Sequence, residues 1–145
     1  MAVRMFRPNG PVHIEWYQKT ASTALAFDEP MALSTAGRLV PYTPGIATPF
    51  LGLCKQTIAS SSTTTAKVPV EVGNQDTEYL IDATTTAAAQ TDVGEFVDYV
   101  SATASVNVGA STEDDFFVTQ FVSTTLVVGK WARRVASNNL NTAFA

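Results

Sequence analysis

The chain has 145 residues, of which 46% are hydrophobic and only 15% are charged, with a formal net charge of −4 at pH 7. A chain of this length and hydrophobic content can bury a sizeable core as one domain, which excludes a disordered protein. The acidic balance argues against nucleic acid as a partner, because binding phosphates requires a basic patch.

Cys54 is the only cysteine, so an intrachain disulfide and a cysteine metal cluster are excluded. It lies in an apolar stretch, where we expect a buried, unreactive thiol. No stretch approaches the roughly 18 consecutive apolar residues of a membrane helix, and no secretory signal follows Arg4 and Arg7. We therefore expect a soluble protein made in the cytoplasm, with no membrane partner.

Taken in chain order, residues 1–11 predict an N-terminal arm without regular structure, because a turn with two prolines and a glycine closes it. Residues 12–135 are expected to form the folded domain, and residues 136–145 a polar tail. Residues 12–18 predict the first strand, with Val12, Ile14 and Trp16 on one face and His13, Glu15 and Tyr17 on the other. Short strands are expected over residues 31–33, 38–40 and 50–56, and residues 60–65 are expected to form a flexible loop tip.

Two hairpins are predicted in the second half of the chain. Residues 67–72 alternate Val68, Val70 and Val72 with polar residues, and a turn leads them into a strand over residues 79–82. Residues 116–131 predict two strands joined by a turn at residues 123–125. In the first of these strands Phe117, Thr119 and Phe121 would share one face, and Phe116, Val118 and Val122 the other. Because both faces are largely apolar, we expect both to be covered, one by the core and one by something else.

Further strands are expected over residues 95–101 and 104–108, with an acidic loop over residues 109–115. Strands that recur at roughly ten-residue spacing with turn residues between them are typical of a small antiparallel β-barrel or sandwich. The sequence therefore predicts an all-β fold with an extended N-terminal arm. A surface rich in Thr, Ser and Ala and poor in charge can be buried against neighbours at a low desolvation cost.

Residues that could carry chemistry are few. His13 is the only histidine, and no G-x-S-x-G motif accompanies it, so we expect no catalytic triad. Glu113, Asp114 and Asp115 form the densest group of carboxylates, but a solvated acidic loop explains them more simply than a catalytic or calcium site. Tyr17 and Trp131 could stack on sugars, although core or interface positions suit them better. We expect no enzymatic activity, no cofactor and no metal.

The order of the predicted strands resembles the capsid decoration (cement) proteins of tailed bacteriophages, in the group with a small β-barrel body. Five stretches carry the resemblance: Gly37–Pro41, Pro49–Leu53, Val68–Val72, Asp92–Asp98 and Phe121–Trp131.

The resemblance implies a structural virion protein, located on the outer surface of the mature capsid and made in the host cytoplasm. Its partners would be the major capsid protein and copies of itself, in a homotrimer. The expected capsid contacts lie in the arm, with Phe6 as an anchor, Arg4 and Arg7 facing an acidic shell, and Val3, Met5 and Phe6 adding a short strand to a capsid sheet.

Three other functions remain open from the sequence. A carbohydrate-binding β-sandwich would use exposed aromatic residues and the acidic loop. A hydrolase would use His13 or the carboxylates at residues 113–115. Another virion part, such as a head-fibre base or a tail protein, would share most features of a decoration protein.

Overall fold

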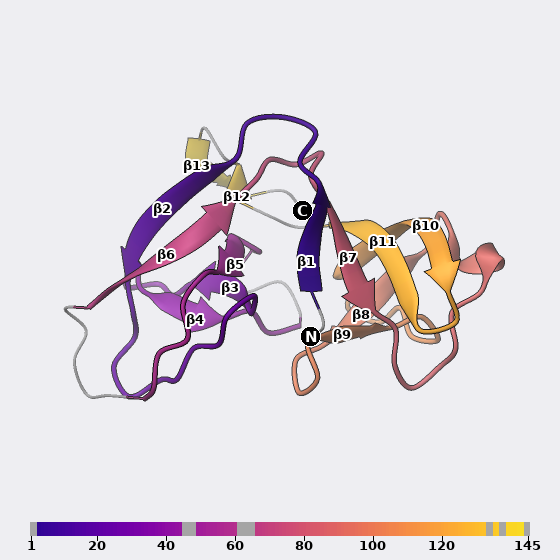
Figure 1. Ribbon diagram of the computed structural model, residues 1–145, viewed down its shortest axis with the longest axis horizontal. Helices are drawn as coiled ribbons and strands as arrows, with labels where there is room; N and C mark the ends of the chain where they lie inside the picture. The colour runs from indigo at the N-terminus through magenta and orange to yellow at the C-terminus, as the bar shows by residue number, and fades with distance from the viewer. Residues whose placement is uncertain (1–2, 45–48, 61–65, 133–134, 137–138, 144–145) are drawn as a thin grey trace.

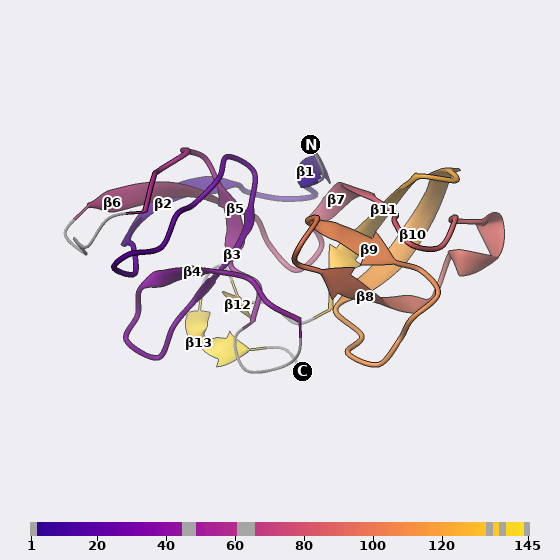
Figure 2. The ribbon, with the colours of Figure 1, turned by 90° about the horizontal axis from the view of Figure 1, so that it is seen from below.

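The fold is all-β, as the sequence predicts, and its strands form antiparallel sheets that do not close into a barrel. The computed structural model describes residues 3–44, 49–60, 66–132, 135–136 and 139–143. Of the predicted loop tip at residues 60–65, all but residue 60 lies outside the described residues. Figures 1 and 2 show two halves side by side, one built around β2 to β6 and the other around β7 to β11.

The first half is a five-stranded sheet in the order β2-β6-β5-β3-β4. Its strands are β2 (His13–Gln18), β6 (Lys67–Val72), β5 (Gly52–Cys54), β3 (Pro30–Leu33) and β4 (Leu39–Pro41). The sheet curls so far that Lys19, directly after β2, forms a parallel bridge with Leu39 of β4. Both faces of its centre are buried, because neighbouring residues of one strand, such as Leu53 and Cys54 in β5, belong to different core clusters.

The second half is a six-stranded sheet in the order β1-β7-β11-β10-β8-β9. Its strands are β1 (Val3–Arg7), β7 (Glu78–Asp82), β11 (Leu126–Trp131), β10 (Phe116–Ser123), β8 (Phe96–Val100) and β9 (Ser105–Asn107). A short 3-10 helix, η1 (Gln90–Asp92), precedes β8. Near the C-terminus, β12 (Val135–Ala136) pairs with β13 (Asn139–Ala143), so the predicted tail contains a two-stranded ladder.

Two predictions about strand pairing had different outcomes. The hairpin over residues 116–131 is confirmed, since Phe116 of β10 pairs with Trp131 of β11. The hairpin between residues 67–72 and 79–82 is wrong, because β6 joins the five-stranded sheet and β7 the six-stranded one. The connection over residues 73–77 therefore passes from one sheet to the other, and β6 and β7 each pair with strands far away in the sequence.

The predicted faces of β10 hold only for its first half. Phe116 and Val118 share a face as expected, and this face packs on the core, but a β-bulge lies between Val118 and Gln120. The extra residue shifts the alternation by one. As a result Phe121 packs against the core together with Phe116, and Val122 is exposed to solvent.

The two halves are joined by a cluster of aromatic side chains around Trp131. Phe50, which precedes β5, stacks on the Trp131 ring at a centroid distance of 4.4 Å. Tyr42, which follows β4, meets the same ring edge-on at 5.1 Å, and Phe116 meets it at 5.2 Å. Such pairs add specific geometry to the free energy of apolar burial.

A buried carboxylate lies beside this cluster. Asp115 is fully buried and accepts a hydrogen bond of 2.7 Å from the Tyr42 hydroxyl and one of 3.1 Å from the Tyr99 backbone N–H. A buried carboxylate is tolerated only with such partners. Burial, followed by the charges of Glu29 and Asp115, raises the pKa of Tyr99. Asp115 therefore belongs to the core that joins the halves, although the sequence placed it in a solvated acidic loop.

The two tryptophans offer a matched test of this packing. Trp131 is 2% exposed and Trp16 is 58% exposed. Because Trp131→Ala removes the centre of the aromatic cluster, we expect it to lower the free energy of unfolding by about 3–5 kcal/mol. Trp16→Ala should lower it by less than about 1 kcal/mol. Urea denaturation followed by circular dichroism measures both, and equal losses would contradict the role given to Trp131.

Candidate interaction surface

The predicted arm is a strand of the protein's own sheet. Residues of β1 pair with β7 in the register Val3 with Ile81 and Arg4 with Leu80. The sequence argument against regular structure fails because the prolines and the glycine lie after residue 7, where they shape the turn into β2 and leave β1 intact.

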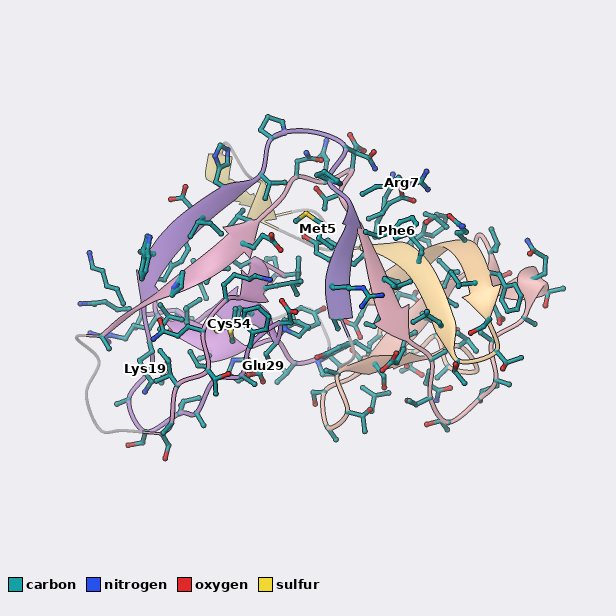
Figure 3. All side chains as sticks on the ribbon, viewed as in Figure 1. Met5, Phe6, Arg7, Lys19, Glu29 and Cys54 are labelled. Carbon is teal, nitrogen blue, oxygen red and sulfur yellow. The ribbon has the colours of Figure 1, made fainter. Side chains whose placement is uncertain are left out.

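The five predicted capsid-contacting residues therefore fall into two groups. Val3 is 1% exposed and Met5 is half-buried, and both pack into the core that the two sheets share. Arg4, Phe6 and Arg7 are exposed, with Phe6 at 42%. In Figure 3, Met5 lies on the side of β1 towards the five-stranded half, and Phe6 and Arg7 lie on the opposite side. These three exposed side chains are available to a partner while β1 stays paired with β7.

An ion pair fixes the end of β1. Arg7 Nε lies 2.7 Å from Glu78 Oε1, and the Glu78 side chain is only 8% exposed. The same carboxylate accepts hydrogen bonds from Thr119 Oγ1 at 2.7 Å and Asn9 Nδ2 at 3.3 Å. Burial alone would raise the pKa of Glu78, but the hydrogen bonds from Thr119 and Asn9 and the positive charge of Arg7 outweigh it and hold the pKa below its ordinary value of 4.5.

The solvent-facing side of the six-stranded sheet carries several exposed aromatic residues. Phe96 of β8 is 45% exposed and lies opposite Phe117 of β10, with ring centroids 4.9 Å apart. Phe117 in turn pairs with Lys130 of β11. At the β1 edge, the Arg7 guanidinium lies 5.3 Å from the centre of the Phe6 ring, within cation–π range. We call Arg4, Phe6, Arg7, Phe96, Phe117 and Lys130 the outer face.

The expectation that one face of residues 116–122 would be covered by something other than the core is relevant here, because Phe117 lies on the face turned away from the core. Phe117 is half-buried by its neighbours, but nothing in the described chain packs over Phe96 enough to shield it. In the sequence, the outer face was indicated only by residues 116–122, which are largely apolar on both sides of the strand. Phe96 was identified only as apolar bulk within its strand.

A second apolar surface lies on the five-stranded half. Ile14 and Trp16 of β2 are 50% and 58% exposed. The sequence correctly placed them on one face, and the structure shows that this face points to solvent. The opposite face carries His13, Glu15 and Tyr17, and Tyr17 packs against the second core cluster.

Trp16 is connected, through Pro69 of β6, to a cation–π contact between Lys55 and Phe27. Trp16 pairs with Pro69 of β6, whose carbonyl accepts a hydrogen bond from the Lys55 backbone N–H at 2.9 Å. The Lys55 ammonium lies 4.4 Å from the centre of the Phe27 ring and 2.6 Å from Asp28 Oδ1. Lys55 is thus held by an acid and a ring, and Trp16 remains the most exposed large apolar side chain.

The other residues that the sequence offered as catalytic or sugar-binding candidates lie in a strand, in an ordered loop or in the core. His13 is an exposed residue of β2 opposite Val72. The carboxylate of Asp98 accepts hydrogen bonds from the backbone N–H groups of Thr112, Glu113 and Asp114, at 3.1, 2.7 and 3.0 Å, and so orders the acidic loop. Trp131 lies in the core and cannot stack on a sugar.

Cys54 is buried, as predicted, and Figure 3 shows it next to Glu29. Its Sγ lies 3.0 Å from the Gln56 carbonyl oxygen, to which it donates a hydrogen bond. Burial raises the pKa of the Cys54 thiol, which disfavours the reactive thiolate.

An open cavity of about 450 Å³ lies between the two halves. Its lining comprises Val3, residues 26–29 and residues 101–104. Burial raises the pKa of Glu29 in this wall, against the opposing effect of a hydrogen bond from the Ala26 backbone N–H. Asp28, the other acid of the wall, is paired with Lys55.

Comparison with known proteins gives no relative: no family model matches the sequence, and no curated protein matches it. Among the described residues, no group of three or more His, Cys, Asp or Glu side chains is placed to hold a metal ion. No helix in that part of the chain has the length and apolar character that a membrane crossing requires.

The attachment of β1 can be tested through Glu78. Since its pKa in the folded state is lowered, its stabilising effect is full above the ordinary carboxyl pKa and is lost as the pH falls through the folded-state value. We expect Glu78→Gln to lower the free energy of unfolding at pH 7 by about 1–2 kcal/mol. The difference from wild type should shrink as the pH falls below 4.5. Urea titrations at several pH values measure it, and a difference independent of pH would contradict the charged pairing.

Proposed function

We propose that the chain is a structural virion protein that binds the outer surface of the mature capsid and stabilises contacts between neighbouring major capsid subunits, as a homotrimer. The observation that carries the proposal is the outer face, a sheet surface that exposes Phe6, Arg4 and Arg7 along its β1 edge and Phe96 on β8. Aromatic and arginine side chains are the residue types that most often anchor protein interfaces.

The charge distribution supports the same surface. The protein carries a net charge of −4, yet Arg4, Arg7 and Lys130 all belong to the outer face. Arg7 is paired with Glu78, and Lys130 lies 3.8 Å from Asp76, so the exposed Arg4 is the cation through which this face would favour an acidic partner surface. Only 15% of the residues are charged, which reduces the desolvation cost of burying the rest of the surface.

The structure changes the mechanism that the arm was expected to use. β1 is already bonded to β7 on one side, and a β-bulge between Met5 and Arg7 interrupts its regular spacing. A bulge and charged side chains on an edge strand disfavour the addition of another strand. The proposed capsid contact is therefore made by the side chains of Arg4 and Phe6 on a strand that is already folded.

Stabilisation of the shell would follow from linkage. A protein that binds the expanded shell and has no affinity for the precursor lowers the free energy of the expanded form by its own binding free energy. Trimeric binding would raise the effective concentration of the second and third contacts, so that weak single contacts add to a durable attachment.

The test is co-sedimentation of the purified chain with expanded capsids and with unexpanded precursors. We expect saturable binding to the expanded form only. Arg4→Glu and Phe6→Ser should each weaken this binding about tenfold or more, because both side chains are exposed and belong to the proposed contact. Deleting residues 1–9 is a poor substitute, since it removes a strand with buried Val3.

Phe27→Ser is the matched control, because Phe27 is 55% exposed but lies in the other half of the molecule. It should leave binding unchanged. Binding that is lost equally in the control, or that is the same for precursor and expanded capsids, would argue against the outer face. No binding to any capsid would overturn the proposed function.

A carbohydrate-binding role is the second candidate, and Trp16 is the observation that favours it. A tryptophan exposed by 58% on a strand is well suited to stacking on a sugar ring. Binding on a glycan array that Trp16→Ala abolishes and Phe6→Ser leaves intact would select this role.

A further inference from the structure

The ends of the two large sheets differ in how well they are protected. β1 has a bulge and two arginines. β4 is three residues long, ends at Pro41 and is bridged by Lys19. β9 is also three residues long, and Val106 within it is bridged by Ala83. Short strands, bulges, proline, charge and covering segments are the devices by which proteins prevent edge strands from pairing with other chains.

β2 has fewer of these devices: it carries one charged residue, Glu15, and the bridge between Lys19 and Leu39 covers only the edge beyond its last residue. Its six residues pair with β6 in unbroken register from His13–Val72 to Gln18–Lys67. The strand contains no lysine, arginine, proline or glycine. Ile14 and Trp16 are half or more exposed on one of its faces. In the described chain β6 is the one strand that pairs with it, and Figure 1 shows β2 along the outer margin of its half.

We propose that β2 pairs with β2 of a second copy of this chain, antiparallel and about a two-fold axis perpendicular to the sheet. The five-stranded sheet of one copy would then continue into that of the other. Such an axis keeps the two outer surfaces on the same side, so residues that face each other across it must come from the same face of the strand. The six residues of β2 allow two central registers, one with Glu15 opposite Glu15 and one with Trp16 opposite Trp16.

Charge selects between these registers. Glu15 opposite Glu15 would bring two carboxylates together on the axis, and like charges directly opposite each other destabilise a strand pair. The other register places Trp16 opposite Trp16, Ile14 opposite Gln18, and Glu15 opposite Tyr17. It contains no pair of like charges and joins two exposed indole rings, and aromatic pairs across strands are favourable.

The pairing also has a defined end. Lys19 is fully buried, and the free edge beyond β2 is taken by the bridge between Lys19 and Leu39. The paired segment is therefore Ile14–Gln18, five residues from each copy. Five residue pairs form a small contact compared with the roughly 1,200–2,000 Å² buried in stable interfaces, so we expect a dimer that dissociates on dilution.

The contact is two-fold, so it is separate from the three-fold assembly proposed above and could link one trimer to the next. Its test needs only the purified chain and does not depend on capsid binding. Failure of the β2 contact would leave the proposed function untouched, and failure of capsid binding would leave the β2 contact untouched.

The first experiment is sedimentation velocity of the full chain over a wide range of concentration. We expect reversible self-association that Trp16→Lys weakens about tenfold or more, since a lysine on an edge strand blocks pairing. Val122→Lys is the matched control, because Val122 is 45% exposed on the other sheet. Circular dichroism confirms that both variants remain folded.

The second experiment fixes the register by disulfide formation. In the proposed register a double variant, Ile14→Cys with Gln18→Cys, places each new cysteine opposite the other kind in the second copy. Mild oxidation should then give a covalent dimer, while each single variant should give none. The two cysteines of one copy cannot bridge, because four residues of strand span about 13 Å.

Two results would overturn the proposal. One is a wild-type chain whose mass does not change with concentration and whose double-cysteine variant stays uncrosslinked. The other is self-association that Trp16→Lys and Val122→Lys weaken equally, which would place the contact elsewhere.

Discussion

The packing of Trp131 against aromatic side chains from both sheets is the interaction on which the arrangement of this protein depends. Each sheet holds its own strands together by backbone hydrogen bonds, and the two halves share a core at whose centre Phe50 and Tyr42 pack against Trp131. The hydrogen bond from Tyr42 to the buried Asp115 adds direction to this contact. Because the inner faces of the two sheets are buried in this shared core, the surfaces available to partners are the outer face and the exposed side of β2.

Much of the strand content was predictable, and the reason is the regular alternation of residues such as those in β6 and β2. The hairpin at residues 116–131 could also be predicted, because a short polar turn separates two strongly apolar runs. The pairing of β6 with β2 and of β7 with β1 could not. Those partners lie some 50 to 80 residues apart in the chain, and the sequence contains no local signal for such distant contacts.

The candidate surface was predicted only in part, for a related physical reason. Alternation shows which residues share a face but not which face turns inward, and in β2 the apolar residues Ile14 and Trp16 turned out to face solvent. In β1 the predicted contact residues divide by the same alternation, with Val3 in the core and Phe6 outside. In β10 the first of two register shifts, between Val118 and Gln120, reversed the faces beyond Thr119. Bulges depend on the partner strand, and a single sequence does not specify them.

The order of strands in the sheets also determines when the protein can fold during its synthesis. β1 and β2 are synthesised before their partners β7 and β6, which begin only at Glu78 and Lys67. β11, among the last strands to be made, lies in the middle of the six-stranded sheet between β7 and β10. That sheet therefore cannot be completed until Trp131 has been synthesised. Until β6 has been synthesised, the β2 strand, with its apolar Ile14 and Trp16, stays unpaired.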